Sequence, residues 1–209
     1  MASDHHRVQL DPNFLLYVRF YSESWKDETY EARIRSDYGN SKQRGLRKSA
    51  EAMVSGYRSF DAVRQGVLQQ FVDEATKTPN CAILPVLKDL DRSMACTFTT
   101  TREPFECCVT GDTHPMGVIM TLTPDPDNPF GPVAKTYALR SDFKKLLQAY
   151  RILTRFRYVV MKCVVQATSA PTAVVRPLHE NMDKCQEVYD KYLHAQKMLQ
   201  YVIQESHTL

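Results

Sequence analysis

In residues 94–101, MACTFTTT, the hydrophobic pattern of the chain changes from a helical period to alternation. Thr and Phe favour extended backbone, and the alternation is typical of a half-buried strand. Three segments of similar chemistry follow before residue 140, at 105–110, 118–123 and 133–139. Short strands in succession predict a small antiparallel β-meander over residues 94–140.

Two turns divide this region. Residues 111–115, GDTHP, separate the second segment from the third, and residues 124–132, PDPDNPFGP, form the clearest loop in the chain. Its four prolines cannot donate to a strand ladder. Asp125 and Asp127 in this loop could hold a divalent cation, but the acid-x-Lys pair of a nuclease does not follow at residues 133–135. We interpret them as solvated loop residues.

Helical periods occupy both sides of the meander. Helices are expected over 12–90, with Asp11 as a cap and a break at Gly56 and Ser59, and two long helices over 141–168 and 176–206. With a flexible tail over 1–10, the prediction is a single α+β domain over 11–209. This domain is mostly helical, and the meander is inserted between its N-terminal and C-terminal helices.

The last helix has the most regular apolar stripe, with steps of four and three residues. The stripe consists of Leu178, Met182, Cys185, Tyr189, Tyr192, Gln196, Leu199 and Ile203. It could pack against residues 142–166 of the same chain. Tyrosines and a polar seam residue also suit an interface. Tyr189, Tyr192, Gln196 and Leu199 are therefore predicted interface residues for a protein partner or for self-association.

Basic residues gather on one line of the helix expected from residue 141. Lys144, Arg151, Arg155 and Lys162 fall within about 20° of each other at 100° per residue. We call these four residues the basic ridge; it would be about 27 Å long at 1.5 Å per residue. Asp142 is the one acid between residues 140 and 162. Because solvated faces usually mix both signs, the ridge predicts contact with phosphate backbones, and a solvated face is the alternative.

A second basic group precedes the apolar stripe that starts at Leu46. It contains Lys42, Arg44, Arg47 and Lys48 and is called the 42–48 cluster below. Arg58 and Arg64 extend it along the chain. A charged helix entry is the plainer interpretation, but two basic groups in one chain together favour nucleic-acid binding.

Thiols and imidazoles give weaker signals. Cys96, Cys107, Cys108 and His114 lie within 19 residues, but adjacent cysteines point to opposite faces of a strand and no C-x-x-C pair is present. Even with Cys81 as a fourth ligand the spacing is poor, so no metal site and no cofactor are expected. A Cys108–His114 nucleophile pair lacks a supporting signature.

The composition excludes several classes of protein. The chain has 209 residues, 43% hydrophobic and 24% charged, which excludes a disordered tail and a collagenous chain. With no apolar signal core and no long apolar run, the six cysteines should be reduced thiols in an intracellular protein that is nuclear or cytoplasmic, not secreted and not in a membrane. The common nucleotide, hydrolase and metalloprotease motifs are missing.

These observations predict a non-enzymatic accessory or regulatory protein that binds nucleic acid without reading its sequence. The alternative is an assembly or adaptor protein that acts through the amphipathic C-terminal helices.

Overall fold

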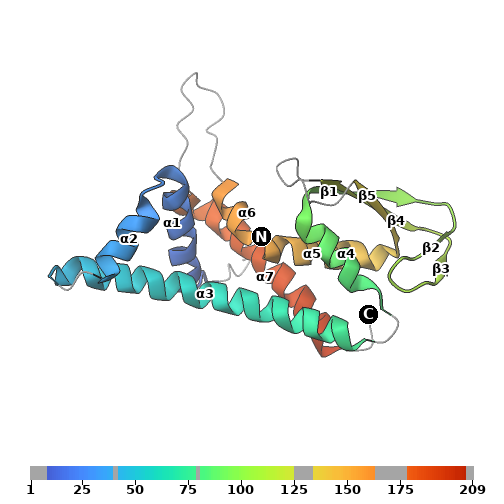
Figure 1. Ribbon diagram of the computed structural model, residues 1–209, viewed down its shortest axis with the longest axis horizontal. Helices are drawn as coiled ribbons and strands as arrows, with labels where there is room; N and C mark the ends of the chain where they lie inside the picture. Colours follow the sequence, from blue (N-terminus) through green and yellow to red (C-terminus); the bar gives the residue numbers. More distant parts are fainter. Residues whose placement is uncertain (1–8, 40–41, 79–80, 125–133, 163–177, 206–209) are drawn as a thin grey trace, which may run out of the picture. The chain divides into compact units, whose positions relative to one another are not determined.

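The computed structural model describes residues 9–39, 42–78, 81–124, 134–162 and 178–205 (Figure 1). It confirms the predicted fold class, because helices precede and follow a small antiparallel sheet. The elements are α1 (Pro12–Lys26), α2 (Tyr30–Gly39), α3 (Arg44–Lys77), α4 (Ile83–Arg92), β1 (Ser93–Thr101), β2 (Phe105–Glu106), β3 (Thr113–His114), β4 (Gly117–Pro124), β5 (Lys135–Leu139), α5 (Ser141–Thr154), α6 (Phe156–Lys162), the 3-10 turn η1 (Leu178–Glu180) and α7 (Met182–Gln204).

The chain forms two compact units. The first contains residues 1–65 and 155–193, and the second contains residues 66–154 and 194–209. Helices α3 and α7 each contribute residues to both units. The prediction of a single domain over 11–209 stays a prediction. None of the helices in the described ranges is long and apolar enough to cross a bilayer.

An aromatic core holds the first unit together. Asp11 caps α1 as predicted, and its carboxylate accepts a hydrogen bond of 2.8 Å from the backbone N–H of Asn13. From α1, Tyr17 packs on Phe60 with ring centroids 4.8 Å apart and on Phe156 at 5.7 Å. Tyr192 of α7 closes the cluster at 4.7 Å from Phe60. Edge-to-face and tilted rings at these distances pack favourably.

The predicted break at Gly56 and Ser59 is wrong, because α3 runs without interruption from Arg44 to Lys77. Gly56 lies inside this helix, where it contacts α1. A Cβ added there would lie 2.1 Å from Cδ1 and 3.0 Å from Cβ of Leu16 on α1. The glycine therefore permits α1 and α3 to approach closely inside a continuous helix.

The second unit contains the sheet, in the order β1-β4-β5 with both pairings antiparallel. Met120, Leu122 and Leu139 are buried on the sheet. Helices α4 and α5 pack against it, and Figure 1 shows them beside the strands. The predicted strand over 105–110 is shorter, because residues 107–111 turn back through Gly111 at φ 75° and leave a two-residue hairpin of β2 and β3.

A polar network ties α4 to β5. The ammonium of Lys135 lies 2.7 Å from Oδ2 of Asp89, and the hydroxyl of Tyr137 donates to the same oxygen. Burial alone would raise the pKa of Asp89, but these two hydrogen bonds and the charge of Lys135 lower it below its ordinary value. The ionised carboxylate thus fixes α4 against the last strand.

Candidate nucleic-acid interface

The four residues of the basic ridge do not share one helix. The ridge was predicted for a single uninterrupted helix. It requires one helix over 141–168, but α5 ends at Thr154 and α6 begins at Phe156. The Thr154 hydroxyl donates to the carbonyl of Arg151 at 3.3 Å, the carbonyl that the backbone N–H of Arg155 takes in a continuous α-helix. The Thr154 hydroxyl thus shares a backbone acceptor at the point where α5 ends. Lys144 lies in the second unit with Arg151, whereas Arg155 and Lys162 belong to the first.

Arg151 is bound within its own unit. Its guanidinium donates to the carbonyl of Leu90 at 3.1 Å, to the hydroxyl of Ser93 at 2.9 Å and to the carbonyl of Met94 at 2.8 Å. These acceptors belong to the end of α4 and the start of β1, so Arg151 fastens this junction to α5. Of the other ridge residues, Lys144 and Arg155 are half-buried, and the side chain of Lys162 lies outside the described part of the structure.

Arg151→Gln should lower the stability of the fold. The change removes charge-assisted hydrogen bonds to a junction where Ser93 is fully buried, so we expect a loss of about 2–3 kcal/mol in the free energy of unfolding. Lys145→Gln on the same helix is the matched control, because Lys145 is exposed. Urea unfolding compares the two variants. Equal stabilities would contradict this role and would show that the three hydrogen bonds of Arg151 contribute little to the fold.

The 42–48 cluster lies at the beginning of the longest helix. Arg44 and Lys48 are exposed one turn apart on α3, and neither has an ion pair among the described residues. Lys42 is exposed just before the helix. Arg47 is half-buried and lies 3.4 Å from Glu51, with a third or more of each side chain open to solvent. Glu51 offsets part of the charge of Arg47, so the exposed positive charge of this cluster comes chiefly from Lys42, Arg44 and Lys48.

The placement of this cluster conflicts with helix electrostatics. The N-terminus of a helix carries a partial positive charge, and acidic residues in the first turn usually compensate for it. The first turn of α3 contains no acid and includes Arg44 and Arg47. Backbone N–H groups and basic side chains therefore present the same sign at one end of α3. This arrangement disfavours the isolated helix and favours a bound anion.

Arg58 and Arg64, which extend the 42–48 cluster along the sequence, differ in exposure. Arg58 is exposed on α3 and adds to the positive surface. Arg64 is buried, and its Nε and Nη2 atoms donate to Oδ1 of Asp61 at 2.9 and 2.6 Å. The spacing of basic residues gave no signal for this burial.

Net charge is unequal between the two units. The sequence of the first unit has 17 Lys and Arg against 13 Asp and Glu, a net charge of +4. The second has 10 against 11, a net charge of −1. The net charge of +3 of the whole chain therefore comes from the unit that contains the 42–48 cluster.

The predicted interface residues of the last helix are mostly core residues. Tyr192 is 2% exposed and Leu199 is 0% exposed, whereas Gln196 is half-buried. Tyr189 is also buried, and its ring lies 4.6 Å from that of Phe14 on α1. These side chains stabilise the chain itself, which corrects their assignment to a partner surface.

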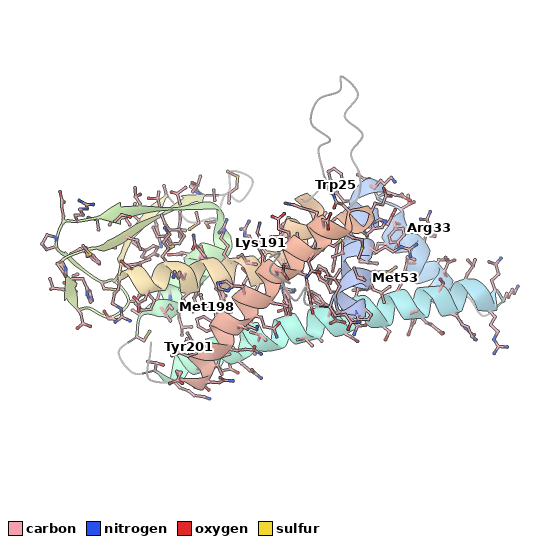
Figure 2. All side chains as sticks on the ribbon, turned by 180° about the vertical axis from the view of Figure 1, so that it is seen from behind. Trp25, Arg33, Met53, Lys191, Met198 and Tyr201 are labelled. Carbon is pink, nitrogen blue, oxygen red and sulfur yellow. The ribbon has the colours of Figure 1, made fainter. Side chains whose placement is uncertain are left out.

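Sequence patterns missed an apolar groove of about 440 Å³ in the second unit. It is lined by residues of α5, including Phe143 and Leu146, and by Met198, Tyr201 and Val202 of α7. Figure 2 labels Met198 and Tyr201 on the C-terminal part of α7, and the Tyr201 side chain is 59% exposed. The apolar stripe predicted for this helix includes Leu199 and Ile203 but none of these three residues, which lie beside it.

The cysteine and histidine candidates do not assemble into a metal centre. Over the described ranges, no three His, Cys, Asp or Glu side chains lie close enough to hold an ion. Nε2 of His114 is buried and lacks a hydrogen-bond partner there, and Cys108 makes no hydrogen bond to it. Asp125 and Asp127 lie outside the described residues.

No protein-family model, curated protein or solved structure matches this chain.

Proposed function

We propose that this protein is a non-enzymatic, nucleic-acid-associated accessory protein whose 42–48 cluster binds phosphate backbones. One observation carries the proposal. Exposed basic side chains lie at the positive end of the 34-residue helix α3, without an acid in its first turn. Anions bind at such helix ends because N–H groups and side-chain charges act together. The +4 net charge of the first unit supports the same interpretation.

Binding through this cluster is independent of base sequence. Arg and Lys contacts to phosphates position a protein on a nucleic acid but carry no sequence information directly. Arg44 and Lys48 are four residues apart and so about 6 Å apart along the helix axis. Side chains at this spacing on one exposed face can contact neighbouring phosphates while the remainder of α3 stays packed in the fold.

The test is a mobility-shift assay at low salt with random duplex DNA and random RNA. The double variant R44Q/K48Q should bind each of them roughly tenfold or more weakly, because two phosphate contacts are lost. The matched control is K184Q/K191Q, which removes the same net charge from α7. Both control lysines pair with Glu187, at 2.7 and 2.9 Å.

Equal losses in the two variants would mean that only net charge matters, and would contradict a defined site. Weakening confined to one base sequence would mean direct base reading, which backbone contacts alone do not produce. If the wild-type chain binds neither DNA nor RNA, the adaptor alternative takes the place of this proposal. Its remaining surface is then the apolar groove between α5 and α7, since the tyrosines predicted for it are buried.

A further inference from the structure

The two edges of the three-stranded sheet differ in how they are protected. On the β5 edge, the backbone N–H of Cys108 donates to the carbonyl of Ala138 at 3.0 Å, so the segment after β2 covers this strand. Strand β5 is also only five residues long and begins with Lys135. Short strands, lysines and covering loops are the usual protections of a sheet edge. The β5 edge is therefore closed to a further strand.

Strand β1 forms the other edge. Among the described residues, β4 is the one strand that pairs with it. Arg151 binds its first two residues, through the Ser93 hydroxyl and the Met94 carbonyl. No described residue makes a backbone hydrogen bond to the side of residues 95–101 that faces away from β4. We call residues 95–101 the open edge, because alternate N–H and C=O groups of such a strand point outward.

The open edge lacks the features that usually prevent strand addition. Its sequence, ACTFTTT, contains no charged residue, no proline and no glycine. Its register with β4 is regular, from Ala95 opposite Thr123 to Thr101 opposite Gly117. Thr and Phe both favour extended backbone. A long, regular and uncharged edge is a template for pairing with another strand.

We propose that the open edge pairs with the open edge of a second copy of this chain. The two strands run antiparallel about a two-fold axis, so the three-stranded sheets of the two copies join into one. This interface is isologous, since the same residues are used on both copies. Because the β5 edge of each copy is covered, pairing stops at a dimer and does not extend into a fibre.

The sequence of the open edge is complementary to itself. Full overlap of residues 95–101 places the middle residue, Phe98, opposite its own copy. Phe98 is half-buried and lies opposite Met120 in the register with β4, on the buried face of the sheet. On the other face, Thr97 lies opposite Thr99 of the second copy. Aromatic and Thr–Thr cross-strand pairs are favourable, and a charged strand would instead repel its own copy.

The first experiment measures the molar mass of the full-length chain by size exclusion with light scattering over a dilution series. We expect the wild type to have twice the mass of one chain and to dissociate on dilution. Thr97 and Thr99 are exposed, so T97K/T99K should keep the fold. It opposes like charges across the two-fold axis and should raise the dissociation constant of the dimer roughly tenfold or more.

The matched control is T123K/T136K. Thr123 of β4 and Thr136 of β5 are exposed on the same face as Thr97, and the variant adds the same charge away from the open edge. It should dimerise like the wild type. Circular dichroism should show that all variants are folded.

A charge-swap experiment tests the pairing itself. T97E/T99E should be as poor a dimer as T97K/T99K, whereas an equimolar mixture of the two should form a heterodimer, because opposite charges then face each other. The heterodimer is detected by capture through a tag on one of the two variants.

Four outcomes would overturn the proposal. The first is a wild-type chain that is monomeric at every concentration at which it is folded, which would leave the open edge to a strand of another protein. The second is a dimer that T97K/T99K does not weaken, or that T123K/T136K weakens equally. The third is a mixture of the Lys and Glu variants that stays monomeric, and the fourth is growth beyond the dimer.

Discussion

A chain that ends at residue 176 should be insoluble. The deletion removes α7 and η1, which supply buried side chains to the fold. These are Leu178, Cys185, Val188, Tyr189, Tyr192, Ala195 and Leu199. Truncation of one large buried side chain costs roughly 2–5 kcal/mol, and a whole domain is stable by only about 5–15 kcal/mol. The loss of several such groups therefore exceeds the stability of the fold.

Expression and a soluble-fraction assay measure this effect. A chain that ends at Glu205 is the matched control, because it keeps α7 complete, and it should remain soluble and helical. A folded, soluble 1–176 chain that no longer self-associates would contradict the burial of Tyr189 and Tyr192. It would instead support the hypothesis that the last helix is a partner surface.

Phe156→Ala should be among the most destabilising point substitutions. Phe156 is 0% exposed at the start of α6, and its ring lies 5.8 Å from Phe60 and 5.0 Å from Tyr192. Removal of a buried phenyl ring leaves a cavity and costs about 3–5 kcal/mol. Chemical denaturation followed by circular dichroism gives the change in the free energy of unfolding.

Tyr158→Ala is the control for this substitution. Tyr158 is an aromatic residue two positions further along the same helix, and it is 58% exposed. We expect its replacement to change the stability by no more than about 0.5 kcal/mol. If both variants lose similar stability, the effect comes from helix α6 itself and not from the aromatic core.

The hydrophobic period along the sequence predicted the fold class, because it depends on the local backbone conformation. The change of period at residues 94–101 reports backbone geometry, and the structure has β1 there. The glycine at position 56 was misleading, because a glycine that breaks a helix and one that admits Leu16 are alike in sequence. The break between α5 and α6 was missed, since neither a glycine nor a proline marks it in the sequence.

The candidate site was harder to predict than the fold. Periodicity tells which residues share a helix face but not what covers that face. The partners of Arg151 lie at residues 90–94, about 60 positions earlier in the chain, and no local pattern connects them. The 42–48 cluster, by contrast, is local to one helix end. Three of its four residues, Lys42, Arg44 and Lys48, are exposed, and Arg47 is half-buried.

The salt dependence of nucleic-acid binding reports how many phosphates the 42–48 cluster neutralises. If Lys42, Arg44, Arg47 and Lys48 each neutralise about one phosphate, log K for duplex DNA should fall against log salt with a slope of roughly −3 to −4. In R44Q/K48Q the slope should be smaller in magnitude by about 2, whereas K184Q/K191Q should keep the wild-type slope. A wild-type chain that binds neither DNA nor RNA at low salt, or the same slope in all three proteins, would contradict the account.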